Sequence, residues 1–172
     1  MSSALYQKYL NLDIDTALFN LEKRDYTEYF CTPVGAEVIG WEGVDGIHYC
    51  FIPGFGDMVF AVNPMRCDCN VFPLAKNFAD FLGLLLAAKS VTVLEQIISW
   101  DKQVYLDYIN EPDNIKHFSR PELIAALAQM SEKLAVEPIE EPFEYVKAVQ
   151  ADFDYSKIPF SDEYYDVTGL ER

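Results

Sequence analysis

Short apolar runs separated by turn residues mark positions 36–63 as strand-like. The runs EVIGW, GIHYCFI and MVFAV are rich in Val, Ile, Phe and Tyr, and each is bounded by Gly, Pro or Asp, as is typical of strands joined by turns. The connection PGFGD has the length of a larger hairpin loop, and its glycines can adopt the positive φ angles that such loops need. The pattern predicts an antiparallel meander over residues 36–63.

The period of the apolar residues changes after Lys76 from that of a strand to that of a helix. Four apolar residues follow at positions i, i+3, i+4 and i+7, the spacing of one helix face: Phe78, Phe81, Leu82 and Leu85. This spacing predicts a helix over about residues 77–89, and we expect that helix to cover one face of the sheet.

More helices are expected further along the chain. Thr92 and Glu95 have the spacing of a capping box, in which a hydroxyl and a carboxylate satisfy backbone donors at the start of a helix. A third helix is expected over 104–109, and the segment NEPDNIKHF that follows is expected to be a loop. The first thirty residues suggest short helical pieces that lead to an extended entry at TPVG.

The C-terminal third begins with a second candidate capping box, Ser119 and Glu122, on either side of Pro121. An apolar stripe then continues at helical spacing through Leu123, Leu127, Met130 and Leu134. A last short helix is expected at about 143–153, and the tail DYSKIPFSDEYYDVTGLER shows no clear period. Strands gathered early and helices gathered late predict a single α+β domain with an antiparallel sheet and helices packed around it.

The net charge of -15 makes the chain strongly acidic, and two regions carry most of the excess. Residues 25–65 hold six acids and no Lys or Arg, and residues 137–172 hold ten acids and three bases. This balance disfavours nucleic-acid phosphates and anionic membranes as partners and favours a basic protein. The competing interpretation is a surface whose charge only keeps the protein soluble.

The compartment is expected to be the cytoplasm. The N-terminus MSSALYQKYLNLDIDT lacks the basic start and apolar core of a signal peptide, and the longest apolar run, 81–88, is too short to span a bilayer. The four cysteines, which are therefore expected to be free thiols, are Cys31, Cys50, Cys67 and Cys69.

Two pairs of residues could be imagined as metal ligands, and each has one intervening residue: His48 with Cys50, and Cys67 with Cys69. Structural zinc pairs usually have two to four intervening residues, so that a tight turn aims both ligands at one ion. We therefore expect no metal. His48 and Cys50 are also unconvincing as base and nucleophile, because one strand fixes their direction and no third orienting group is evident.

A calcium site and a nucleotide cofactor are not expected either. Asp152, Asp154, Ser156 and Glu163 occupy positions 1, 3, 5 and 12 of an EF-hand frame, but Lys157 replaces the glycine needed at position 6. The chain has neither a GxGxxG motif leading from a strand into a helix nor a GK[ST] motif. No pair of carboxylates stands out as an acid and base, so no catalytic residue is assigned.

The segments GWEGVDGIHYCFI, GFGDMVFAVNP and VFPLAKNFADFLGLLL together resemble the SUKH superfamily of bacterial toxin-immunity proteins and fungal cell-wall-synthesis regulators. The similar features are the strand at Gly40–Trp41, the turn at Gly56–Asp57 and the aromatic spacing of the helix that follows the sheet. The resemblance covers residues 34–90. It implies an α+β core over residues 1–110, to which residues 111–172 add a helical C-terminal extension on the same domain.

The resemblance implies a non-enzymatic module that binds a partner protein, in bacterial members often a toxin such as a nuclease. Our first hypothesis is an immunity protein that neutralises a basic toxin domain by direct binding. The candidate contact residues are the loop acids Glu37, Glu42, Asp45 and Asp57, with Trp41 either an apolar anchor or a core residue. The alternatives are a regulatory scaffold in cell-wall synthesis or signalling, and an enzyme with an unrecognised carboxylate site.

Overall fold

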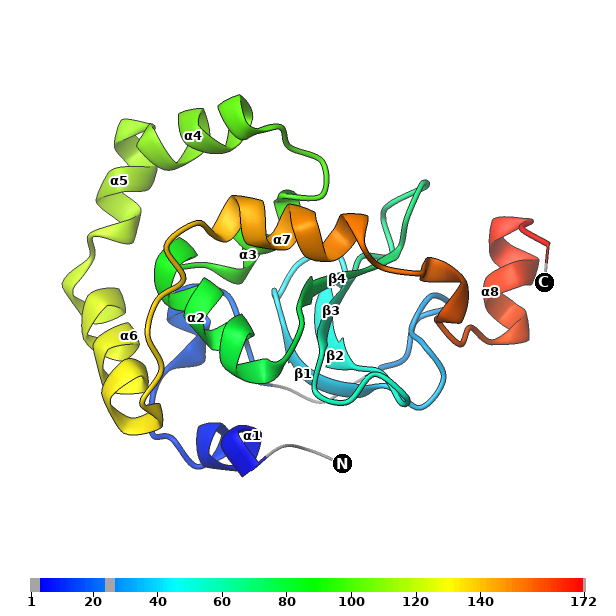
Figure 1. The fold of residues 1–172 in the computed structure, drawn as a ribbon, viewed down its shortest axis with the longest axis horizontal. Helices are drawn as coiled ribbons and strands as arrows, with labels where there is room; N and C mark the ends of the chain where they lie inside the picture. Colours follow the sequence, from blue (N-terminus) through cyan, green and yellow to red (C-terminus); the bar gives the residue numbers. More distant parts are fainter. Residues whose placement is uncertain (1–3, 24–26, 172) are drawn as a thin grey trace.

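A computed structural model describes residues 4–23 and 27–171, which form a four-stranded antiparallel sheet and eight α-helices (Figure 1). The strands are β1 (Glu37–Trp41), β2 (His48–Phe51), β3 (Val59–Val62) and β4 (Val71–Ala75), in that spatial order. The prediction of a single α+β domain is confirmed. Within the described residues, no helix is long and apolar enough to cross a membrane.

The fourth strand, β4, is not among the strands predicted from the sequence, and Pro73 lies in its middle. Proline cannot donate to the ladder, and it is tolerated in β4 because this strand is at the edge of the sheet. The edge is covered by the C-terminal half of the chain, since Gln150 Nε2 donates a hydrogen bond of 3.3 Å to the Pro73 carbonyl. At the other edge, Glu22 and Trp41 exchange backbone hydrogen bonds of 2.7 and 2.9 Å.

The helices account for most of the remaining chain. The α-helices are α1 (Ala4–Leu10), α2 (Phe78–Ala88), α3 (Val91–Gln96), α4 (Lys102–Asn110), α5 (Pro112–Phe118), α6 (Pro121–Leu134), α7 (Pro142–Ala151) and α8 (Asp162–Thr168). Two short 3₁₀ helices, η1 (Thr16–Phe19) and η2 (Tyr155–Lys157), accompany them. In Figure 1, α4, α5 and α6 form an arch on one side of the molecule, and α8 lies at the opposite end.

Two of the expected helix starts differ from the observed ones. The cap of α3 is Ser90, whose hydroxyl accepts from the Thr92 backbone, so Thr92 is not the capping residue. Helix α6 begins at Pro121 without a side-chain cap, and the Ser119 hydroxyl donates to the Ile115 carbonyl instead. Proline fits the first turn of a helix because the backbone donor it lacks has no helical partner there.

The same property of proline explains why the expected loop over 110–118 is wrong. Pro112 begins helix α5, which directly follows the end of α4 at Asn110. The tail also holds more structure than its pattern indicated, because η2 and α8 form there. By contrast, α2 and the three strands of the meander agree with the predicted ranges to within a few residues.

The two faces of the sheet are buried by different parts of the chain. Along β2, Tyr49 and Phe51 face the larger core, which is built with residues of α1, α2, α3, α6 and α7. Cys50 and Ile52 face the smaller core, which the C-terminal segment covers with Ile158 and Tyr164. Residues 111–171 therefore pack on the same domain as the sheet, through α6 and α7 on one face and the segment after α7 on the other.

Candidate functional site

The β1–β2 loop, residues 42–47, holds two of the five candidate contact residues, Glu42 and Asp45, and directly follows a third, Trp41. Positive φ angles at Gly43, Asp45 and Gly46 turn the chain sharply, and they leave the Asp45 side chain exposed. Beside the loop is a cavity of about 240 Å³, whose walls include Tyr29, Trp41 and Asp45. The loop therefore presents a carboxylate to solvent at one end of the sheet.

The candidate residues divide between the two ends of β1. Glu37 begins the strand, opposite Phe51, and lines a cavity together with residues of the β2–β3 loop. Asp57, which is half-buried, belongs to that same loop. Asp45 lies beyond the far end of β1, which at about 3.3 Å per residue is about 13 Å long. Two acidic turns thus flank the hairpin instead of forming one cluster.

Trp41 is a core residue in the structure, with only 6% of its surface exposed. Its ring lies 4.7 Å from the His48 ring and 6.0 Å from the Tyr29 ring, measured between centroids. Of the two interpretations of Trp41, the structure favours the core residue, and the side chain is not available as an exposed anchor. Its contribution is to support the β1–β2 loop from beneath.

Glu42 is not the exposed contact that the sequence suggested, because only 8% of its surface is exposed. The Glu42 backbone amide donates a hydrogen bond to the Ile47 carbonyl, so these two residues extend the β1–β2 ladder by one pair. Residues paired across a ladder share a face of the sheet, and Ile47 faces the larger core. Glu42 therefore points inward, where it accepts a short hydrogen bond from the Tyr49 hydroxyl.

Burial raises the pKa of Glu42 to about 7. The hydrogen bonds from the Tyr49 and Thr92 hydroxyls oppose this shift, and the nearby Glu95 carboxylate adds to it. A carboxyl group with a pKa near neutrality is a candidate acid or base when it faces a cleft. The walls of the cavity beside the β1–β2 loop do not include Glu42, so the geometry gives this group a structural role.

The raised pKa predicts a specific pH dependence of stability. Between the ordinary value of 4.5 and about 7, the folded state retains a proton on Glu42 that the unfolded chain has lost. The contribution of Glu42 to the free energy of unfolding should therefore fall as pH rises through this window, by roughly 3 kcal/mol, and level off above it. In Glu42→Gln this fall should be absent, as measured by urea unfolding at pH 5 and pH 8.

The matched control is Glu132→Gln, which changes an exposed carboxyl on α6. This variant should keep the pH dependence of the parent protein. Equal pH dependence in Glu42→Gln and the parent would contradict the inference that Glu42 is protonated in the folded state near neutral pH.

Two further hydrogen bonds hold a second buried carboxylate, Glu95, which the sequence had assigned to a helix cap. Asn63 Nδ2 donates to Glu95 Oε1 at 2.8 Å, and Gln96 Nε2 donates to Oε2 at 2.6 Å. Glu95 is completely buried. The Glu95 carboxylate therefore links the end of β3 to α3 by hydrogen bonds. Its capping-box spacing in the sequence had predicted a different role.

His48 is fully buried, and both ring nitrogens have a partner. Nδ1 donates to the Gly46 carbonyl at 2.8 Å, and Nε2 accepts from the Thr32 hydroxyl at 3.3 Å. The Thr32 hydroxyl in turn accepts from the Tyr29 backbone at 3.0 Å. Burial lowers the pKa of His48, so the neutral ring links the β1–β2 loop to the turn at 29–32.

The cysteines are free thiols in the structure, and burial raises the pKa of Cys50 and of Cys31, the latter to about 11. Cys67 is exposed, and Cys69 is half-buried with its thiol donating to the Val71 carbonyl at 3.3 Å. Within 4–23 and 27–171, no three His, Cys, Asp or Glu side chains group as metal ligands would.

The residues of the EF-hand frame serve local structure. The Asp154 carboxylate caps η2 by accepting from the backbone and the hydroxyl of Ser156, at 3.2 and 2.6 Å. Lys157, at the position where the frame requires glycine, lies 3.5 Å from the same carboxylate. The contacts of the Asp154 carboxylate are therefore made with neighbouring residues of the same short turn.

Comparisons of this chain with protein-family models, with curated proteins and with solved structures gave no match. The resemblance to the SUKH superfamily therefore rests on the sequence motifs alone and stays a prediction.

Proposed function

We propose that this protein is a binding module that docks a basic protein on the acidic turns of its sheet, as a toxin-immunity protein would. The observation that carries the proposal is the absence of Lys and Arg from residues 25–65, the same stretch that builds β1, β2, β3 and both acidic turns. Glu37 and Asp45 are exposed there, and Asp57 is half-buried.

The anchoring of these turns on the sheet supports a recognition role. Binding residues commonly lie on loops that a rigid scaffold positions, and short anchored loops lose less conformational freedom on binding than long mobile segments do. A field of one sign also speeds the encounter with a partner of opposite charge, and salt weakens this effect. A nuclease would suit such a surface, because it must carry basic residues to hold phosphates.

The resemblance to the SUKH superfamily supports an immunity protein over other binding modules. A regulatory scaffold would use the same surface, and the identity of the bound partner distinguishes the two. The enzyme alternative has less support, because Glu42, whose carboxyl pKa is raised towards neutrality, is buried beneath the loop and does not line its cavity.

The test is affinity capture from the native cell with the parent protein and with the triple variant Glu37→Gln, Asp45→Asn, Asp57→Asn. We expect the parent to retain a basic protein at low salt and to release it as salt rises, and the variant to show an association rate about tenfold lower at low salt. Surface plasmon resonance with the purified partner measures both rates.

The matched control also removes three acids, all of them exposed and on the helical arch: Asp107→Asn, Asp113→Asn and Glu132→Gln. This control has the same net charge as the triple variant, so it separates a local contact from the overall field. Equal association rates for the two variants would show that the acidic turns act only as part of the general charge, and the docking proposal would then be wrong.

A further inference from the structure

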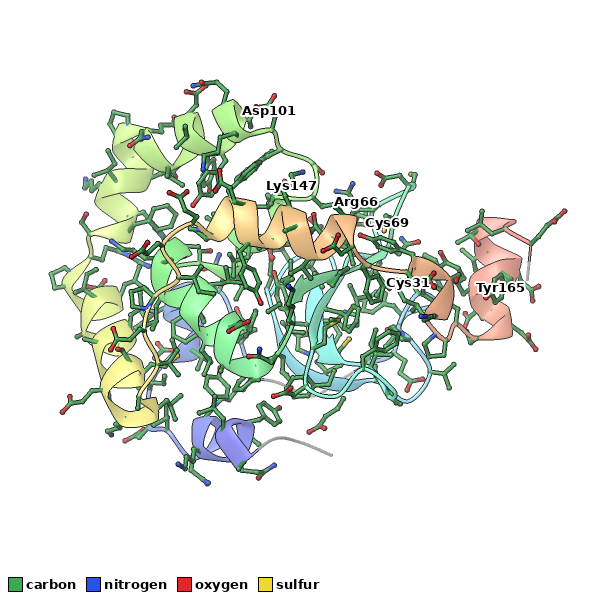
Figure 2. The ribbon with its side chains drawn as sticks, in the orientation of Figure 1. Cys31, Arg66, Cys69, Asp101, Lys147 and Tyr165 are labelled. Atoms are coloured by element: carbon green, nitrogen blue, oxygen red, sulfur yellow. The ribbon has the colours of Figure 1, made fainter. Side chains whose placement is uncertain are left out.

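A cavity of about 370 Å³ lies between the start of β4 and the C-terminal segment. Its walls include four aromatic rings, those of Tyr155, Phe160, Tyr164 and Tyr165. Figure 2 labels two of the lining residues, Cys69 at the β3–β4 connection and Tyr165 on α8. A cavity of this volume lies in the lower part of the range of ligand pockets in proteins.

Contacts among the rings hold this aromatic wall in place. Phe160 and Tyr164 are stacked, with centroids 3.7 Å apart and planes 10° apart, and Tyr165 meets Tyr164 edge-on at 5.4 Å. Tyr164 also stacks on Phe30 at 6.4 Å, which joins α8 to the segment before β1. The rings are therefore positioned before any ligand arrives, which lowers the entropy cost of binding.

The charged groups at the cavity are acidic. Asp68 and Glu171 belong to its lining, and among the lining residues in the described part of the chain none is Lys or Arg. The nearby Arg66 donates to the Ser99 hydroxyl at 2.6 Å and contacts Asp68 at 2.9 Å. In Figure 2, Arg66 lies on the side of Cys69 away from α8. Its charge therefore offsets part of that of Asp68, and Glu171 lies on the wall formed by the C-terminal segment.

Aromatic faces together with carboxylates favour a cation carried on an apolar stem. A guanidinium group suits such walls better than an ammonium group, because it is planar, stacks on rings and is more weakly hydrated. We propose that this cavity binds an arginine side chain presented by a protein partner. The proposal deepens the proposed function and rests on it, since the partner is the basic protein that the acidic turns would dock.

The register of the sheet places the cavity near one of those turns. Trp41 pairs with His48, His48 with Val62, and Val62 with Val71, where β4 enters the cavity wall. Three strand spacings of about 4.8 Å therefore separate the β1–β2 loop from the cavity, about 14 Å in all. One protein partner can reach both within an interface of ordinary size.

The test is an NMR titration of the full chain with the capped tripeptide Gly-Arg-Gly, with Gly-citrulline-Gly as the neutral matched peptide. Citrulline keeps the size and planarity of arginine and lacks its charge. We expect saturable shifts of the tyrosine ring signals of the cavity with the arginine peptide, and binding about tenfold weaker with citrulline. Gly-Lys-Gly should bind more weakly than the arginine peptide.

Two variants locate the binding. Tyr165→Ala should weaken it about fivefold, and the double variant Asp68→Asn, Glu171→Gln should do the same while it leaves every ring in place. The double variant Asp107→Asn, Glu132→Gln, on the helical arch, removes the same two kinds of acid away from the cavity and should bind the peptide as the parent does. The proposal is wrong if citrulline or lysine peptides bind as tightly as arginine, or if the double variant binds like the parent.

The peptide titration uses no partner protein, so it separates this proposal from the proposed function. If a basic partner is captured but the cavity residues do not respond to the arginine peptide, the arginine site is wrong and docking on the acidic turns stands. If the arginine peptide binds but no basic partner is captured, the docking function is wrong and a cation site remains.

Discussion

Replacing Phe78 by alanine should lower the free energy of unfolding by about 4 kcal/mol, the largest loss expected from one substitution in this protein. The Phe78 ring is fully buried and meets four other rings, with centroids between 5.1 and 6.0 Å away: those of Tyr6, Tyr9, Phe51 and Phe81. These rings come from α1, β2 and α2, so the cavity left by alanine would open where three elements meet.

The expected readout is a midpoint of thermal unfolding lower by about 12 °C, at about 3 °C per kcal/mol for a chain of this size. The control is Phe78→Leu, which keeps most of the apolar volume and should cost less than about 1.5 kcal/mol. In both variants, residue 78 follows the helix cap formed by Asn77, whose amide oxygen accepts a hydrogen bond from the Asp80 backbone. A loss in Phe78→Ala no larger than in Phe78→Leu would show that the core closes around the gap.

Gly83→Val should destabilise the protein by about 3 kcal/mol, although valine has a higher helix propensity than glycine. A Cβ at Gly83 would lie 2.8 Å from the Glu137 carbonyl oxygen and 3.2 Å from Ile139 Cγ1. The approach is close because the Ile139 backbone donates to the Gly83 carbonyl at 3.1 Å. Helix α2 therefore packs directly on the backbone of the segment between α6 and α7.

The control for this variant lies one turn further along the same helix. Ala87 is half-buried and lines a cavity of about 170 Å³, so Ala87→Val introduces the same side chain where space exists. It should cost only about 0.5 kcal/mol, from helix propensity. Urea unfolding of the two variants tests the difference, and equal losses would show that contact with residues 137–139 is not the cause.

Phe78 and Gly83 also show which features the sequence predicts and which depend on the tertiary structure. The apolar spacing of Phe78, Phe81, Leu82 and Leu85 predicted the buried face of α2 correctly, because a helix of fixed period can bury only one stripe. The same spacing gave no sign that Gly83 touches a segment more than fifty residues later. That contact depends on where the chain returns after α6.

The candidate site shows the same division. Glu42 follows a strand and precedes Gly43, a pattern that suggested an exposed turn. Its burial follows from one additional ladder pair with Ile47, and from the Tyr49 hydroxyl on the same face of the sheet. A shift of one residue in a ladder exchanges the two faces, and local sequence seldom fixes where a hairpin turn begins to that precision.

The sequence by itself determined the antiparallel meander, the helix α2 and the acidic stretch without Lys or Arg, because short-range periodicity and composition set each of these. Only the tertiary structure decided the fourth strand, in which Pro73 is tolerated at an edge covered by Gln150 from α7. Only the tertiary structure brought the aromatic residues after Asp154 into one cavity wall beside β4. The physical reason is that edge position and ring contacts depend on residues far apart in the chain, whose meeting no local pattern encodes.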